Sequence, residues 1–177
     1  MSSPLTHLVC GPTGAGKTTF ARQLSEQVGG VCFSIDAWMA RLFWMDTPRP
    51  LEAAWSMERV ERCYELIWET SSMIARRGVP CVLDLGLSRA VSRQRFLERA
   101  DRLGLPTRLY VVDAPREDRW RRVEARNCEK GATCQLPFEV TREMFDFVES
   151  QWEPPSDAEL SVCNGIRIAG LGETPPR

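Results

Sequence analysis

Short apolar runs alternate with longer segments of helical periodicity along this chain. The runs are bounded by glycine, proline or acidic residues, which is typical of strands buried inside a parallel sheet. The strands predicted in this way are 5–10, 31–35, 79–85 and 107–112, with a final strand or hairpin made by 160–163 and 166–168 around Asn164-Gly165. This alternation predicts an α/β fold with a mainly parallel sheet, in one domain over residues 1–177.

The segments between the strands carry apolar residues three and four positions apart, as helices that cover a sheet do. We expect helices over 17–28, 37–44, 51–77, 88–103, 116–127 and 141–151. Ser88 is placed to cap the fourth of them. A polar segment, 128–137, separates the last two helices, and we interpret it as a flap within a lid over about 116–152.

The composition excludes several classes of protein. A hydrophobic fraction of 43% and a charged fraction of 27% are those of a folded domain. The net charge of −1 does not favour a long nucleic acid as partner. No apolar run is long enough to span a bilayer, and no signal peptide is visible. An odd number of cysteines, seven, most of them in apolar runs, predicts free thiols and a cytoplasmic protein.

One segment matches the phosphate-binding pattern G-x-x-x-x-G-K-[ST] in full, between the first strand and the first helix. Glycines let backbone N–H groups turn towards a polyphosphate, and the helix N-terminus favours the same anion. Lys17 is expected to neutralise the β- and γ-phosphates of ATP, and the Thr18 hydroxyl to bind Mg²⁺. The nucleotide-binding residues predicted here are Gly11, Pro12, Thr13, Gly14, Ala15, Gly16, Lys17, Thr18 and Thr19.

Two acidic residues lie at the end of a predicted strand or just past one, at the edge where parallel sheets build their sites. Asp36 is a candidate base for an attacking hydroxyl, or a ligand of Mg²⁺ through water; its alternative role is the N-cap of 37–44. Asp84 ends an otherwise apolar run, where a carboxylate is costly unless paired. We expect Asp84 to serve metal or substrate, or else to cap the turn at 86–88.

An arginine-rich helix supplies candidate cations. Arg122 and Arg126 are four residues apart and therefore share a helix face. One guanidinium is suited to stacking on adenine and the other to reaching a phosphate. We count Arg122 among the nucleotide-binding residues and Arg126 among the catalytic residues. The alternative is a solvated charged face, which we favour for Arg119 and Arg121.

Missing motifs narrow the class of phosphate-loop protein. The chain has no N-K-x-D segment of a GTPase and no L-S-G-G-Q segment of a transporter ATPase, and it is short for a hexameric motor. Kinases of small molecules and nucleotides remain.

Gly11 to Thr18, Ser34-Ile35-Asp36, Val82-Leu83-Asp84 and the Arg122/Arg126 pair resemble the P-loop kinase group that includes chloramphenicol phosphotransferase, polynucleotide kinase and zeta-toxin-type proteins. Further segments, such as Asp84-Leu85-Gly86, look like those of a bacterial set of predicted ATP-binding kinases. The resemblance implies a P-loop NTPase three-layer α/β/α sandwich with a five-stranded sheet in the order 2-3-1-4-5 and a lid after the fourth strand. It also implies Asp36 as the acid on the acceptor side.

The same group suggests a role for Arg93, nine residues after Asp84, in binding an anionic part of the acceptor; a surface position on the fourth helix is equally compatible. Trp38 follows Asp36 and is a candidate for stacking on the acceptor, although an aromatic stripe at this spacing is more often core.

These features predict an ATP- and Mg²⁺-dependent enzyme that moves the γ-phosphoryl group of ATP to a hydroxyl of a small molecule, with Lys17, Asp36 and Arg126 as catalytic residues. Two alternatives remain open. One is a 5′-hydroxyl polynucleotide or nucleotide kinase, and the other is an ATP-binding regulatory switch without kinase activity.

Overall fold

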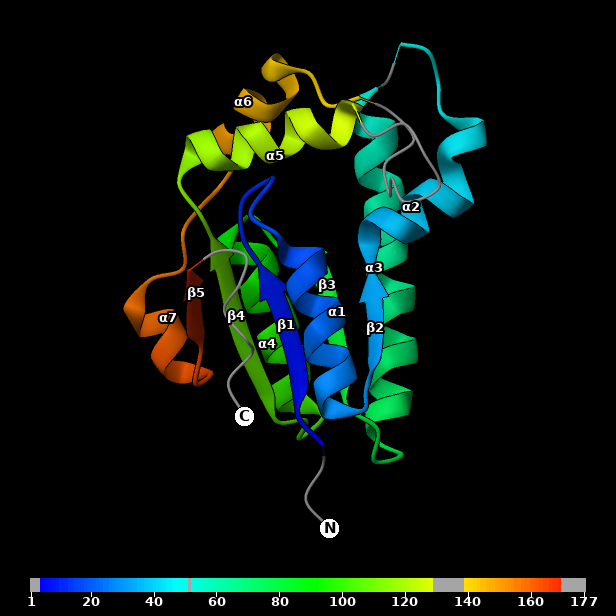
Figure 1. Ribbon diagram of the computed structural model, residues 1–177. Coiled ribbons are helices and arrows are strands. Elements are labelled where there is room, and N and C mark those ends of the chain that lie inside the picture. Colours follow the sequence, from blue (N-terminus) through cyan, green and yellow to red (C-terminus); the bar gives the residue numbers. More distant parts are fainter. Residues whose placement is uncertain (1–3, 51, 129–138, 170–177) are drawn as a thin grey trace.

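Five parallel strands form one sheet in the order β2-β3-β1-β4-β5, as the sequence resemblance implied (Figure 1). The computed structural model describes residues 4–50, 52–128 and 139–169. Because every strand runs the same way, all carboxyl ends meet at one edge of the sheet, beneath α5 in Figure 1. The strands are β1 (Thr6–Cys10), β2 (Val31–Ser34), β3 (Cys81–Gly86), β4 (Thr107–Asp113) and β5 (Ile166–Ala169).

Helices cover both faces of this sheet, because neighbouring residues of each buried strand point to opposite sides. Leu8 packs in a core with α3 and α4, whereas Val9 packs in a second core with α1. The helices are α1 (Lys17–Val28), α2 (Ile35–Phe43), η1 (Trp44–Asp46), α3 (Ala53–Ala75), α4 (Ala90–Arg102), α5 (Arg116–Cys128), α6 (Arg142–Ser150) and α7 (Asp157–Val162).

Helices α5 and α6 lie across the carboxyl edge rather than against a face (Figure 1). They share a third, small core made by Val123, Val140 and Phe145, with Trp120 packed against it. This pair corresponds to the described part of the predicted lid. The predicted flap, 128–137, lies outside the described residues except for Cys128.

Of the final strand or hairpin predicted at the C-terminal end, the strand is confirmed and the hairpin is wrong. Residues 160–163 end a helix, α7, and only 166–168 belong to a strand. Ser156 caps α7 by accepting a hydrogen bond from the Glu159 N–H at 3.1 Å, and the Gly165 N–H closes its end on the Leu160 carbonyl at 2.7 Å. Capping therefore outweighs the short apolar pattern that suggested a strand.

Two helix starts also differ from expectation. Ser34 caps α2 by accepting from the Ala37 N–H at 3.5 Å, so Asp36 is inside the first turn and is not the N-cap. Arg89, not Ser88, is the N-cap of α4. Its first turn is capped instead by Glu153, whose Oε2 accepts from the Ala90 N–H at 2.8 Å. Among the described residues, no helix is both long and apolar enough to cross a membrane.

Candidate active site

The phosphate loop, residues 11–16, connects the carboxyl end of β1 to the first turn of α1. Its glycines leave no room for side chains: a Cβ at Gly11 would meet the Val112 carbonyl oxygen at 2.0 Å, and one at Gly14 would meet the Arg119 carbonyl oxygen at 2.5 Å. The N-cap of α1 is Gly16, which has no side chain to occupy the free N–H groups of the first turn. The loop is therefore held tightly and leaves these donors for an anion.

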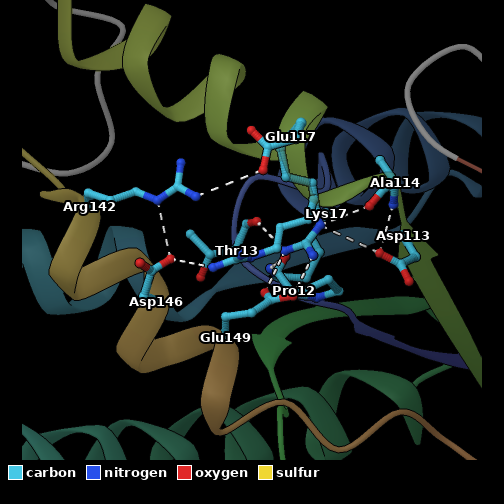
Figure 2. Close-up of polar contacts among 11 residues, drawn as sticks. Pro12, Thr13, Lys17, Asp113, Ala114, Glu117, Arg142, Asp146 and Glu149 are labelled. Carbon is cyan, nitrogen blue, oxygen red and sulfur yellow. Dashed lines mark hydrogen bonds and ion pairs between the residues drawn. The ribbon is translucent and has the colours of Figure 1, made fainter.

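Lys17 bridges this loop, as its Nζ donates to the Pro12 carbonyl at 2.8 Å (Figure 2). Burial lowers the pKa of Lys17, while the carboxylates of Asp84 and Asp36 oppose that shift. The lysine thus lies at the centre of the group of residues that the sequence singled out.

Thr18 and Asp84 join the first turn of α1 to the end of β3, since the Thr18 hydroxyl donates to Asp84 Oδ2 at 2.6 Å. Asp84 is 3% exposed and lies in register with Val9 of β1 and Ser34 of β2. Burial raises its pKa, and the hydrogen bond from Thr18 and the charge of Lys17 lower it. Asp84 therefore faces the phosphate loop, and the turn that follows it is not its partner.

Asp36 is exposed at the start of α2, just beyond the end of β2. Its carboxylate is close enough to raise the pKa of both Asp84 and Lys17. The structure therefore brings Lys17, Thr18, Asp36 and Asp84 together at the carboxyl edge of the sheet.

Oxygen donors at this place suit Mg²⁺, which binds one or two carboxylates and fills its remaining positions with phosphate oxygens or water. The hydroxyl of Thr18 and the carboxylate of Asp84 are adjacent. No group of three or more His, Cys, Asp or Glu side chains in the described residues could hold a metal ion by itself. The donor set fits a magnesium ion shared with a nucleotide rather than an all-protein metal site.

Helix α5 aims one face at the phosphate loop. Arg122 Nη1 donates to the carbonyls of Ala15 at 3.2 Å and Gly14 at 3.5 Å. Arg126, one turn further on the same face, has a buried Nη2 without a hydrogen-bond partner in the part of the chain described here. A buried guanidinium nitrogen without a partner is costly, and an anionic ligand would satisfy it.

The two remaining arginines of this segment differ from each other. Arg121 is exposed, and within the described residues it pairs with Asp118, at 3.5 Å, as expected for a solvated face. Arg119 was expected there as well, but it is 4% exposed and forms an ion pair with Glu149 of α6. The prediction for Arg119 was wrong because its partner lies 30 residues away, on an element whose packing the local pattern does not reveal.

A pocket of about 620 Å³ opens beside the loop, a volume within the usual range of small-ligand sites. Arg122 lines it and also contacts the phosphate loop, so the pocket and the loop are contiguous. The sequence pattern did not predict this pocket, although the Asp113-Ala114-Pro115 turn after the fourth strand forms part of one wall. Its lining residues are Val111, Asp113, Ala114, Pro115, Asp118, Arg122, Arg167, Ile168 and Ala169.

The two weaker acceptor candidates are largely structural. Arg93 is fully buried, so the expected surface position was wrong, and its charge is matched by two hydrogen bonds to Glu159, at 2.6 and 3.1 Å. Trp38 packs partly buried against the core beside Phe33, with ring centroids 6.2 Å apart, in line with the favoured core position. We leave both out of the proposed acceptor site.

Comparisons with known proteins identify the family and the fold of the chain. The family model AAA_33, an AAA domain, matches residues 7–151. Similar solved structures include Chaetomium thermophilum Kti12 in complex with ADP-AlF3, with 18% identity, coverage of 96% of this chain and 91% of that one, and a TM-score of 0.72. No curated protein matches the chain.

Two kinases are also similar in structure. One is the APS kinase CysC of Mycobacterium tuberculosis in complex with AMPPNP and APS, with 15% identity and a TM-score of 0.64. The alignment covers 100% of this chain and 91% of the kinase chain. A sugar kinase from Janibacter sp. HTCC2649 has 18% identity, coverage of 94% and 85%, and a TM-score of 0.65. These likenesses show the shared fold and agree with the P-loop kinase group that the motifs suggested.

Proposed function

Because the chain belongs to the AAA_33 family of AAA domains, and its fold is that of P-loop kinases, we propose that it is an ATP-dependent phosphotransferase. It moves the γ-phosphoryl group of ATP to a hydroxyl of a small molecule. The observation that carries this proposal is the hydrogen bond of 2.6 Å from Thr18 to Asp84, which places a buried carboxylate at the phosphate loop beside Lys17. The charges of Asp84 and Asp36 both act to raise the pKa of Lys17.

The nucleotide lies along α5 in this proposal. The pocket beside Arg122 takes the base and ribose, and the backbone N–H groups of residues 11–16 take the phosphates. Lys17 exchanges its bond to Pro12 for the β- and γ-phosphates. Arg126 supplies the unpartnered nitrogen that neutralises charge on the phosphoryl group as it moves.

Asp36 is the base. Its exposed carboxylate takes the proton from the acceptor hydroxyl as that oxygen bonds to the γ-phosphorus, and the bond from phosphorus to the β–γ bridging oxygen breaks to release ADP. Asp84 and Thr18 would hold Mg²⁺, with Asp36 reaching it through water. When bound, the ion would neutralise charge on the β- and γ-phosphates. Six free thiols in the described residues agree with a cytoplasmic, reducing environment.

Lys17→Ala tests the nucleotide site. Arg121→Ala is the matched control, because it also removes a cation but from the exposed face of α5. Calorimetric titration with ATP and Mg²⁺ should show affinity reduced at least about tenfold in Lys17→Ala, the loss expected for a charge-assisted contact. The control should bind like the wild type. Unchanged ATP affinity and turnover in Lys17→Ala would overturn the assignment.

A further inference from the structure

Arg119 is a buried cation next to the phosphate loop, with a relative exposure of 4%. Its Nε donates to the Ala114 carbonyl at 2.8 Å, at the junction of β4 and α5. Nη1 donates to the Thr13 carbonyl at 3.3 Å and to Glu149 Oε2 at 2.6 Å, and Nη2 donates to Glu149 Oε1 at 2.6 Å. One planar guanidinium therefore ties three segments together: the strand–helix junction, the phosphate loop and helix α6.

Glu149 completes this arrangement from α6, reaching towards the loop at Pro12 and Thr13 (Figure 2). Its hydrogen bonds to Arg119 hold the pKa of its carboxyl below the ordinary value, so it stays ionised. The fully buried ring of Phe145 lies 5.7 Å from the Arg119 guanidinium and fixes the base of α6 against α5. The two-pronged pairing sets the plane of the guanidinium as well as its position.

The neighbouring ion pairs between α5 and α6 are of another kind. Arg116 pairs with Asp146 at 2.6 Å, and both side chains are more than two-fifths exposed. Arg142 contacts Asp146 at 3.3 Å and Glu117 at 3.8 Å, also at the surface (Figure 2). None of these contacts reaches the phosphate loop, so they supply an internal control for the buried pair.

We propose that Arg119 and Glu149 are a positioning pair that holds the Thr13 carbonyl, and with it the phosphate loop, in the shape that receives a polyphosphate. The inference rests on the proposed nucleotide site. Because Nη1 is shared between Thr13 and Glu149, loss of the carboxylate frees the guanidinium to turn towards Asp113, whose Oδ1 is 3.7 Å from Nε. The Thr13 carbonyl then loses its fixed donor, and the phosphate loop is no longer connected to α6 through Arg119.

The test compares ADP with adenosine, since only ADP places phosphates on the loop. In Glu149→Gln, ADP affinity should fall about tenfold, the size of one charge-assisted hydrogen bond. Adenosine affinity should stay within about twofold, because Arg119 still holds Ala114 at the pocket wall. Asp146→Asn, on the same helix, should change neither. Each titration is made well below the thermal transition of the variant, so that a loss of stability does not register as a loss of binding.

Glu149→Ala provides a second variant, for which a larger change in the same direction is expected. If the ratio of ADP to adenosine affinity in both variants equals that of the wild type, the pair is merely structural and the proposal is overturned, while the nucleotide site stands. If the wild type itself binds neither ADP nor ATP, the proposed function fails, and the positioning role fails with it.

Discussion

The hydroxyl of Thr18 donates to Asp84 Oδ2 across 2.6 Å, which joins the start of α1 to the end of β3. A buried carboxylate in an apolar strand needs such a donor, and the bond also places two oxygen ligands side by side. The stability of the nucleotide-free protein and the proposed magnesium site therefore depend on the same contact.

Thr18→Val removes this hydroxyl at nearly constant shape, whereas Thr18→Ser keeps it. We expect the valine variant to lose about 1–3 kcal/mol of unfolding free energy relative to the serine variant, because Asp84 is left without its donor. Urea denaturation without nucleotide measures the difference. Equal stability of the two variants would mean that the contact does not support Asp84.

Glu159→Gln should destabilise the protein by about 3–5 kcal/mol, since it leaves the fully buried guanidinium of Arg93 without its counter-charge. Glu58→Gln is the control, because Glu58 pairs with Arg62 at the exposed surface of α3. Its cost should stay below about 1 kcal/mol. Similar denaturation midpoints for the two variants would contradict the structural role of Arg93.

Gly14→Ala tests the close approach of α5 to the phosphate loop. Its Cβ would lie 2.5 Å from the Arg119 carbonyl oxygen, whereas a Cβ at Gly78, which has a similar positive φ, meets nothing within 4 Å. Both alanines carry backbone strain, so the difference between them isolates the clash. We expect Gly14→Ala to be less stable than Gly78→Ala by about 1–3 kcal/mol in thermal or urea unfolding. An equal loss of stability in the two variants would show that α5 moves away from the added Cβ at no measurable cost.

His7 should make stability depend on pH. Burial lowers its pKa to about 4 from 6.5, so the folded protein keeps the ring neutral while the unfolded chain takes up a proton below the ordinary value. The stability that the folded protein gains from keeping the His7 ring neutral is fully present above pH 6.5 and is lost as the pH falls towards 4. Between about pH 7 and about pH 5 the wild type should lose about 2 kcal/mol more than His7→Gln. Parallel pH profiles would contradict this.

The sequence pattern was sufficient where chemistry is local. The phosphate loop follows from its own glycines and Lys17, and Asp36 and Asp84 follow from the ends of apolar runs in a parallel sheet. The failures involve partners that are distant in sequence. Arg119 looked like a surface residue because Glu149 lies on another helix.

The same limit applies to helix ends and to the pocket. Glu153 caps α4 from 63 residues away, which no local signal at Ser88 could indicate. The pocket needs β5 beside β4, a pairing fixed only by the completed sheet.

Phosphoryl transfer from γ-labelled ATP tests the central claim most directly. Wild type, Asp36→Asn and Lys17→Ala are incubated with Mg²⁺ and a panel of nucleosides, antibiotics, sugars and 5′-hydroxyl oligonucleotides. We expect label on a small-molecule hydroxyl with the wild type. Asp36→Asn should abolish transfer while binding ATP within about twofold of the wild type, because Asp36 takes the acceptor proton and would reach the Mg²⁺ of the nucleotide only through water. Tight ATP binding by the wild type without transfer to any acceptor, or undiminished transfer by Asp36→Asn, would contradict the account.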